Sequence, residues 1–371
     1  MTDTLTTSGF SRETLPAPDG QPAFVTALRE GALETFEALP IPSPETEEWR
    51  YTDLTGFDFG FRPFTDGGGP EAVDRHGLLA AAGVSGERGG LQIQRNSEVI
   101  STQVVEAAGQ RGVILADLDR AAATHPDLVE PHLHSLVPVD RTKFTALHAA
   151  FRTGGTLVYV PKNVRVDLPL QTLTYLDVDG AAVFPHTVIV AEEGAEVTFI
   201  DRLASPALER ALSHAVVEIH AGPNSRVSYV CLQEWGEGVT HLSVQRARVD
   251  RDARVRTLVV TLGASLSRSE AETTLEGDGG SSEMLGMYFG DGRQHFDHRS
   301  IQDHFGDRTA SDLLYKGALK GASRAVYTGT VIIEKDAHRC DAYQTNRNVL
   351  LSDRAKADSV PNLEILTNDP V

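Results

Sequence analysis

The chain has 371 residues, a formal net charge of −18 at pH 7 and a hydrophobic content of 40%, which is ordinary for a globular protein. The acidic balance disfavours nucleic acid as a partner, because binding to phosphate backbones needs a positively charged face. No apolar run approaches the roughly 18 residues that a membrane helix needs, so we expect no membrane association. The first residues lack the basic start and apolar run of a secretory signal, which predicts a cytoplasmic protein.

The first part of the chain predicts a mixed, largely helical region over residues 23–155. It is preceded by residues 1–22, which are rich in Thr, Pro and Gly and predict a flexible N-terminus. Apolar residues recur every three or four positions from Ala23 to Leu39 and predict a helix, which Pro40 ends. First strands and then two short helices are expected in turn over Leu91–Ser101, Asp117–Ala123 and Arg141–Phe151.

From Thr156 onward, short strand-forming runs follow one another without an intervening helix, and Gly, Asp, Asn and Pro fill the gaps. Parallel α/β folds need crossover helices, so this pattern disfavours them. We therefore expect residues 156–371 to form one solenoid of stacked strands. The expected strands include Thr156–Val160, Gln171–Leu176, His186–Val190, Glu196–Ile200, His214–Ile219, Arg226–Leu232 and Val255–Leu262.

A weak internal repeat supports the solenoid. Small residues recur near the starts of strands, first 30 residues apart and then at steps of 28. Such periods are typical of solenoids, whose coils bury their inward side chains only by stacking on their neighbours. The repeat positions are Ala195, Ser225, Ala253, Ser281, Thr309 and Ala337.

Common catalytic motifs are absent from the sequence, which contains no GxxxxGK[ST], HExxH, GxSxG or SxxK. We therefore expect a protein that is not an enzyme. Cys231 and Cys340 are far apart and outside any CxxC motif, so each is interpreted as a small buried apolar residue. Two alternatives stay open: a carbohydrate-active β-helix enzyme, with acids converging on an outer groove, and a purely structural β-solenoid.

The densest group of metal-preferring residues lies between Gln294 and His304. In an extended strand His298 and His304 share one face, and His295 and Asp297 share the other. Imidazoles and carboxylates suit iron or zinc, which makes His298 and His304 weak candidates for a metal site. We favour structural polar side chains on the outside of the solenoid, because no third and fourth ligand of suitable spacing accompanies them.

Four further histidines lie between residues 125 and 148. Their spacing follows no regular ligand pattern, so we assign no function to them. They are His125, His132, His134 and His148.

The C-terminal part alternates strand-forming and polar residues. Gln344, Asn346 and Asn348 fall two apart, which indicates a ladder of amides on one face of a strand. The sequence of this part closely resembles the SufB/SufD family of the SUF iron–sulfur cluster assembly system. The likeness is strongest from about residue 140 onward and is carried by Gly321–Lys335, Ala342–Ser352 and Pro361–Leu366.

A second string points to one branch of that family. Glu47-Glu-Trp-Arg-Tyr-Thr-Asp-Leu54 by itself predicts a packed N-terminal segment. It also resembles the N-terminal signature of SufD-type rather than SufB-type members. We therefore expect a SufD-like protein.

The resemblance implies a scaffold subunit with a right-handed parallel β-helix between helical N- and C-terminal parts. Such subunits pair with a SufB-like subunit and work with a SufC-like ATPase. It also implies a transient iron–sulfur cluster at the interface of the complex and no cofactor in the isolated chain. By this resemblance Tyr343, Gln344, Asn346 and Asn348 lie close to the SufB-like partner, and a homodimer through the same edge is an alternative pairing.

The chain departs from the family pattern at two places. It ends at Val371, where the family continues with a Cys-x-His string and helices that dock SufC, so we expect a chain without the C-terminal helical domain. Where the family usually shows Asn within a Leu-Asn-x-Ala string, this chain has His148. We assign no function to that change.

Overall fold

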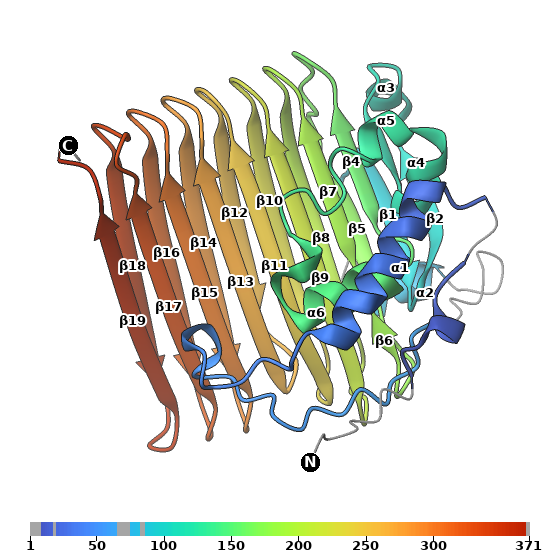
Figure 1. Ribbon diagram of the computed structural model, residues 1–371, viewed down its shortest axis with the longest axis vertical. Coiled ribbons are helices and arrows are strands. Elements are labelled where there is room, and N and C mark those ends of the chain that lie inside the picture. The colour runs from blue at the N-terminus through green and yellow to red at the C-terminus, as the bar shows by residue number, and fades with distance from the viewer. Residues whose placement is uncertain (1–8, 18–19, 65–74, 82–85, 369–371) are drawn as a thin grey trace.

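The protein is a parallel β-solenoid of about 7 turns, preceded by a few helices (Figure 1). The computed structural model describes residues 9–17, 20–64, 75–81 and 86–368. Within them the strands form two sheets that lie against each other, and each full turn adds one strand to each sheet. The expected fold class, a mainly β solenoid after an α-helical segment, is confirmed. Parts of the expected flexible N-terminus, residues 1–8 and 18–19, lie outside the described residues, as do residues 369–371.

The two sheets run from the N-terminal helices to the last described strands. The first sheet has the order β18 (Asp341–Leu350), β16 (Ala310–Leu319), β14 (Ser281–Gly290), β12 (Arg254–Thr261), β10 (Arg226–Glu234), β8 (Glu196–Ala204), β5 (Leu170–Tyr175), β1 (Gly90–Arg95) and β2 (Glu98–Val104). The second sheet has the order β19 (Lys356–Ile365), β17 (Arg324–Ile333), β15 (His295–His304), β13 (Leu266–Leu275), β11 (Val239–Val249), β9 (Ala211–Ala221), β7 (His186–Ala191), β4 (Thr156–Val160) and β3 (Ile114–Asp117), and β6 (Ala182–Val183) pairs with β9.

The helices belong to the N-terminal region. The α-helices are α1 (Ala23–Ala38), α2 (Arg75–Ala81), α3 (Glu106–Gly109), α4 (Leu118–Thr124), α5 (Pro126–Val129) and α6 (Lys143–Phe151), and the 3-10 turns are η1 (Arg12–Thr14), η2 (Glu47–Trp49) and η3 (Val139–Arg141). Capping explains two of the boundaries: the Asp117 carboxylate accepts from the Asp119 backbone N–H at the start of α4, and the Thr142 hydroxyl accepts from the Thr145 N–H at the start of α6. No helix among these described segments is long and apolar enough to cross a membrane.

Inward-facing side chains stack on the same position of the next coil, because neighbouring strands pair in register. Val227 of β10 lies between Val197 of β8 and Val255 of β12. All three are buried, and β10 alternates buried and partly exposed residues along its length. A single coil could not bury this face, so each coil depends on the coils on either side.

The repeat seen in the sequence marks the corners of the solenoid. Register pairing aligns the residues that precede successive strands of the first sheet, which are Ala195, Ser225, Ala253, Gly280, Thr309 and Cys340. Small side chains fit there because the corner is buried, as the exposures of Ser225 (0%) and Cys340 (1%) show. Ser281 is the first residue of β14, one position after the aligned corner Gly280, whereas Ala337 lies three positions before the corner Cys340 and outside any strand. The steps between corners are 30, 28, 27, 29 and 31 residues rather than nearly constant.

The N-terminal region and the solenoid share their sheets. β1 and β3 precede Thr156 and already belong to the first and second sheet. The first full coils therefore form on strands from the mixed region. The division of the chain into residues 1–22, 23–155 and 156–371 stays a prediction.

The N-terminal segment covers the second sheet from outside (Figure 1). α1 packs against α6, and α6 packs against β9. Beyond α1 the chain continues along the sheet as far as β15, where Thr52 reaches Asp297. A cluster of buried aromatic rings fills the space beneath α1 and α6, and it comprises Phe10, Phe36, Phe59, Phe144, Phe151 and Phe184.

We expect Phe144→Ala to destabilise the protein by about 3–5 kcal/mol, because it removes a buried ring and leaves a cavity. Phe144 is 1% exposed and contacts Phe59 with ring centroids 5.6 Å apart. Denaturant unfolding measures the change. Phe305→Ala is the control, since Phe305 is 48% exposed and its loss should cost less than about 1 kcal/mol. Equal effects of the two substitutions would show that the N-terminal layer is not packed as described.

Candidate functional site

The two histidines of β15 face the interior of the solenoid. His298 is 1% exposed and stacks on Tyr288, with ring centroids 4.9 Å apart. Neither ring nitrogen of His298 has a hydrogen-bond partner among the described residues. His304 is 0% exposed, and its ring nitrogens each lie 2.8 Å from a hydroxyl, of Thr309 and of Ser311. The expected position of both histidines on the outside of the solenoid is therefore wrong.

The phase of β15 explains this correction. Its even-numbered residues point inward, as the buried side chains of Phe296, Ser300 and Gln302 show. Six residues of extended strand span about 20 Å, so His298 and His304 are too far apart to bind the same ion. That the pair forms no metal site in solution stays a prediction.

The opposite face of β15 anchors the N-terminal segment. Asp297 is 3% exposed, and its carboxylate lies 2.5 Å from the guanidinium of Arg268 on β13. It also accepts a hydrogen bond from the Thr52 hydroxyl. Arg268 donates to the backbone carbonyl of Glu48 at 2.7 Å and lies 4.1 Å from the centre of the Trp49 ring. The Trp49 string is thus a packed segment, held by one buried ion pair.

The last two strands form the open end of the solenoid (Figure 1). Within the described part of the chain, β18 pairs only with β16 and β19 only with β17, so one edge of each strand has no strand partner. Tyr343 points outward and is 66% exposed. Gln344, Asn346 and Asn348 lie on the other face, and the Asn348 amide donates to the Asn346 side-chain oxygen at 2.7 Å. Their proximity to a partner stays a prediction.

Apolar side chains that face the solenoid axis are exposed at this end. Leu363 and Ile365 of β19 align with Val331 and Ile333 of β17, which are buried. Leu363 is nevertheless 62% exposed and Ile365 45% exposed. Leu350, at the end of β18, is 51% exposed. We call these three side chains together the apolar end surface: Leu363 and Ile365 lie over one buried cluster of the preceding coil and Leu350 over another. Exposed apolar side chains of this size are typical of contact surfaces.

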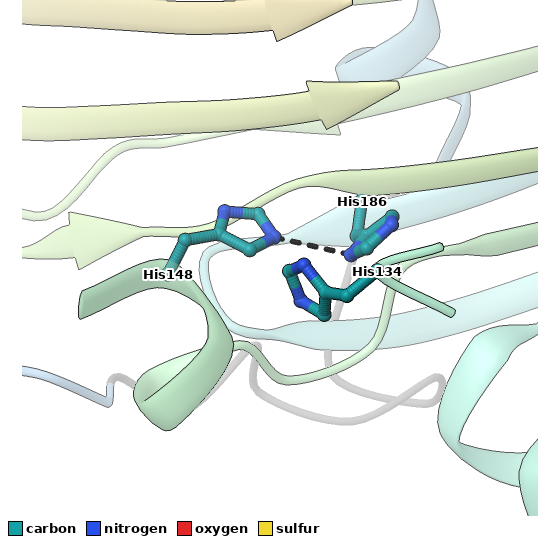
Figure 2. A group of neighbouring side chains, drawn as sticks. All are labelled: His134, His148 and His186. Carbon is teal, nitrogen blue, oxygen red and sulfur yellow. Dashed lines mark hydrogen bonds between the residues drawn. The ribbon is translucent and has the colours of Figure 1, made fainter. Parts of the chain in front are cut away.

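A third group lies where the N-terminal helices cover the second sheet. His134 comes from the loop after α5, His148 from α6 and His186 from the start of β7. Figure 2 shows the three rings gathered together, and one ring nitrogen from each lies within 4.8 Å of the others. Sequence spacing missed this group, because His186 is 38 residues from His148 along the chain. Only the packing of α6 and the preceding loop on β7 brings the three together.

Both thiols are buried, as expected. Cys231 lies inside the solenoid, where burial and the neighbouring Asp201 carboxyl raise the pKa of its thiol. Cys340 occupies a corner and accepts from the Thr309 hydroxyl at 3.2 Å. A buried thiol with a raised pKa is a poor nucleophile, so Cys231 lacks the surroundings of a reactive cysteine.

These features define a parallel β-solenoid protein with an open strand edge at one end. Residues 174–371 match the family described as SUF system FeS cluster assembly, SufBD core domain, and residues 89–172 match the SufBD protein N-terminal region. Among similar curated proteins, the iron-sulfur cluster assembly protein SufD of Bacillus subtilis is 30% identical over 355 residues, which cover 94% of this chain and 80% of that protein. An iron-sulfur cluster assembly SufBD family protein of Staphylococcus epidermidis is 26% identical, covering 94% of this chain and 77% of the relative.

The chain belongs to the SufB/SufD family of iron–sulfur cluster assembly proteins. The resemblance inferred from its C-terminal strings is confirmed, and the named SufD relative agrees with the SufD-like character of the Trp49 string. These relatives favour an assembly role over a carbohydrate-active enzyme.

We expect Arg268→Ala to destabilise the fold by about 3–5 kcal/mol, because it leaves the Asp297 carboxylate buried without its cation. The segment around Trp49 should then be cleaved faster in limited proteolysis. Arg256→Ala is a matched control: Arg256 pairs with Glu283 at 2.8 Å on the exposed face of β12, and its loss should cost less than about 1 kcal/mol. Unchanged cleavage in Arg268→Ala would contradict the anchoring role.

We expect His298 to make the fold sensitive to acid. Burial lowers the pKa of its imidazole from 6.5 to about 4. As the pH falls below about 6.5, the unfolded chain takes up this proton first, so stability declines until about pH 4. His298→Phe should reduce this decline by up to about 1.4 kcal/mol per pH unit.

Unfolding free energies measured at several pH values between neutral and acid test this prediction. His125→Phe is the control, because the His125 side chain is exposed and should not change the slope. An identical pH dependence in wild type and His298→Phe would mean that His298 does not stay neutral in the fold.

Proposed function

We propose that the protein is a non-catalytic scaffold subunit of iron–sulfur cluster assembly, which pairs with a SufB-like subunit and works with a SufC-like ATPase. The observation that carries the proposal is the open end of the solenoid, where β18 and β19 present unpaired edges. Family membership supplies the assembly context. The iron–sulfur cluster is the cargo of the complex and forms transiently at the interface between subunits.

The open end suits pairing with a similar solenoid. An unpaired strand edge offers backbone N–H and C=O groups at regular spacing, and a second chain can extend the sheet by hydrogen bonding to them. The apolar end surface would be covered in the same step. Tyr343 adds an exposed aromatic ring on the outward face of β18, and tyrosine is a residue type enriched among the residues that dominate binding energy at interfaces.

The amides of β18 give the end surface its specificity. Asn346 and Asn348 are held in place by Tyr288, whose hydroxyl donates to the Asn348 side-chain oxygen at 2.5 Å. The amide nitrogen of Gln344 is buried and has no hydrogen-bond partner among the described residues. This nitrogen lies beside Gly329 of β17, so the Gln344 side chain would have to turn outward to donate to a partner strand.

The cluster chemistry falls mainly to other groups in the complex. Thiolates are the preferred ligands of iron–sulfur units. Both cysteines of this chain are buried, Cys231 inside the solenoid and Cys340 at the corner that precedes β18. We therefore propose that this part of the chain positions the partner subunits and leaves most of the ligation to them.

We expect the double variant Leu363→Asp/Ile365→Asp to weaken binding to the SufB-like subunit of the same genome by about 30-fold or more, the effect of losing hot-spot contacts. Both side chains are exposed in the isolated chain, so folding should be unaffected. Val105→Asp is the control, because Val105 is 46% exposed and lies next to the first strands, at the other end of the solenoid.

Calorimetry with purified subunits, with and without the SufC-like ATPase, measures the affinities. Light scattering on the chain alone shows whether the same surface forms a homodimer, which the double variant should then dissociate. Wild-type protein that binds neither subunit contradicts the proposed function. Wild-type affinity in the double variant contradicts the placement of the interface.

A further inference from the structure

The three-histidine group beneath α6 has a hydrogen-bond pattern that leaves one nitrogen of each ring without a hydrogen. Nδ1 of His148 lies 2.9 Å from the backbone carbonyl oxygen of His214. Because a carbonyl oxygen only accepts, Nδ1 carries the hydrogen and Nε2 carries the lone pair. Nε2 of His186 lies 3.0 Å from the Glu218 carboxylate, so Nε2 carries the hydrogen and donates it, and Nδ1 carries the lone pair. These tautomers are assigned from the acceptors that the two rings face.

The two lone pairs point at each other. His148 Nε2 and His186 Nδ1 are 3.2 Å apart, the contact drawn as a dashed line in Figure 2. His148 Nδ1 also lies 3.3 Å from His214 Nδ1. With the tautomers given above, His148 Nε2 and His186 Nδ1 are two acceptors at hydrogen-bond distance, which repel, and a positive centre between or beside them would relieve this contact. A proton or a metal ion can supply it.

His134 contributes a third lone pair. Its Nδ1 lies 3.2 Å from the backbone carbonyl of Val137, so Nδ1 donates there and Nε2 carries the lone pair. That Nε2 atom is buried and has no hydrogen-bond partner among the described residues. The backbone of His134 is in the left-handed region, with φ of 56°, and this conformation is held by a 2.7 Å hydrogen bond from its N–H to Glu218.

Glu218 orients the group through hydrogen bonds to His134 and His186. It is 0% exposed, and its carboxylate accepts from His186 and from three backbone N–H groups, those of His134, Leu136 and Val137. Its four acceptor positions are therefore used, so it does not ligate a metal directly. A carboxylate that holds the far nitrogen of a histidine is the usual outer partner of a metal-bound imidazole, and its charge would offset part of a cation's.

A metal ion fits this setting better than a proton. Burial lowers the pKa of His134 to about 3 and lowers the pKa values of His148 and His186 well below 6.5. A proton can bridge only two nitrogens, whereas a metal ion can bind three neutral imidazoles, and one nitrogen from each of three rings gathers here within 4.8 Å. Two nitrogens of a tetrahedral zinc site lie about 3.3 Å apart, given zinc–nitrogen bonds of about 2.0–2.1 Å. The His148–His186 separation of 3.2 Å already meets this requirement.

We propose that His134 Nε2, His148 Nε2 and His186 Nδ1 bind one divalent transition-metal ion of the zinc or iron class, with Glu218 as the outer partner of His186. A fourth position is left for water or another ligand. His134 and His148 belong to residues 89–172 of this chain, which match the SufBD N-terminal region, and His186 belongs to the core match. The ion therefore joins the N-terminal region to the solenoid. The site stands independently of the proposed partner function.

Metal binding to the isolated chain tests this site. The wild-type protein, freed of metal with a chelator, is titrated with Zn²⁺ by calorimetry and with Co²⁺ by visible absorption. We expect one equivalent of each ion and the intense bands of tetrahedral Co²⁺. Zn²⁺ should also raise the melting temperature. Elemental analysis of protein purified without chelator tells whether zinc or iron is carried from the cell.

Two variants remove single ligands. In His148→Asn the amide can still donate to the His214 carbonyl, but the nitrogen that faces His186 is lost. His134→Ala changes a loop residue and leaves both packed histidines in place. Each should weaken Zn²⁺ binding by about 100-fold or more, a loss at least as large as that from removing an outer partner. His304→Asn is the control. His304 is a buried histidine of β15 whose two ring nitrogens each contact a hydroxyl, and its substitution should leave Zn²⁺ binding unchanged.

The results that support the metal site differ from those that overturn it. Loss of binding and of the Zn²⁺-dependent melting shift in both folded variants, with retention in His304→Asn, supports the site. If His148→Asn fails to fold by circular dichroism, His134→Ala decides alone. Wild-type protein that takes up neither Zn²⁺ nor Co²⁺ saturably, or a His134→Ala variant that binds like wild type, overturns the proposal.

Discussion

The register of the parallel coils is the constraint on which the rest of the structure depends. Because each strand pairs with the strand one coil away, the same inward positions stack along the whole solenoid, as Val197, Val227 and Val255 do. The corner positions must then accept a small buried side chain in every coil. Within the described residues the series of coils stops at β18 and β19, where inward-facing side chains have no further strand beside them. The apolar end surface at β18 and β19 follows directly from this geometry.

The N-terminal segment is held on the second sheet by two polar anchors as well as by aromatic packing. The first is the buried pair of Arg268 and Asp297, which fixes the Trp49 string over β13 and β15. The second is Glu218, which gathers the backbone of the loop after α5 and orients His186. Buried charges stabilise little by themselves, but they specify one arrangement when every lone pair has a donor. Both anchors join segments that are far apart in the sequence.

Much of the fold could be predicted from the sequence, because its signals are local. Alternating strand-forming runs and the absence of crossover helices predicted the solenoid, and the helix expected over Ala23–Leu39 is α1. The repeat positions predicted from the sequence depart from the corners where loop lengths change. Ser281 and Ala337 lie near, but not at, the aligned positions Gly280 and Cys340. Periodicity alone could not show which face of β15 points inward. That choice depends on contacts with the coils on either side.

The candidate sites were less predictable, because they depend on the long-range arrangement of the chain. His298 and His304 are close in sequence, but the extended strand separates them in space. His134, His148 and His186 show no ligand spacing, yet three elements bring their rings together. The only sequence signal for this group is the density of histidines between His132 and His220. At the end of the solenoid, the spacing of Gln344, Asn346 and Asn348 did predict their common face.

Hydrogen exchange measured with and without the SufB-like subunit tests most directly the claim that the open end is a pairing surface. An unpaired edge strand exposes backbone amides that exchange quickly, and pairing protects them. The account predicts that binding slows exchange in β18 and β19, whereas β2 and β3 at the other end of the two sheets keep their rates. Protection confined to β2 and β3, or no change at β18 and β19 in a complex that forms, would contradict it.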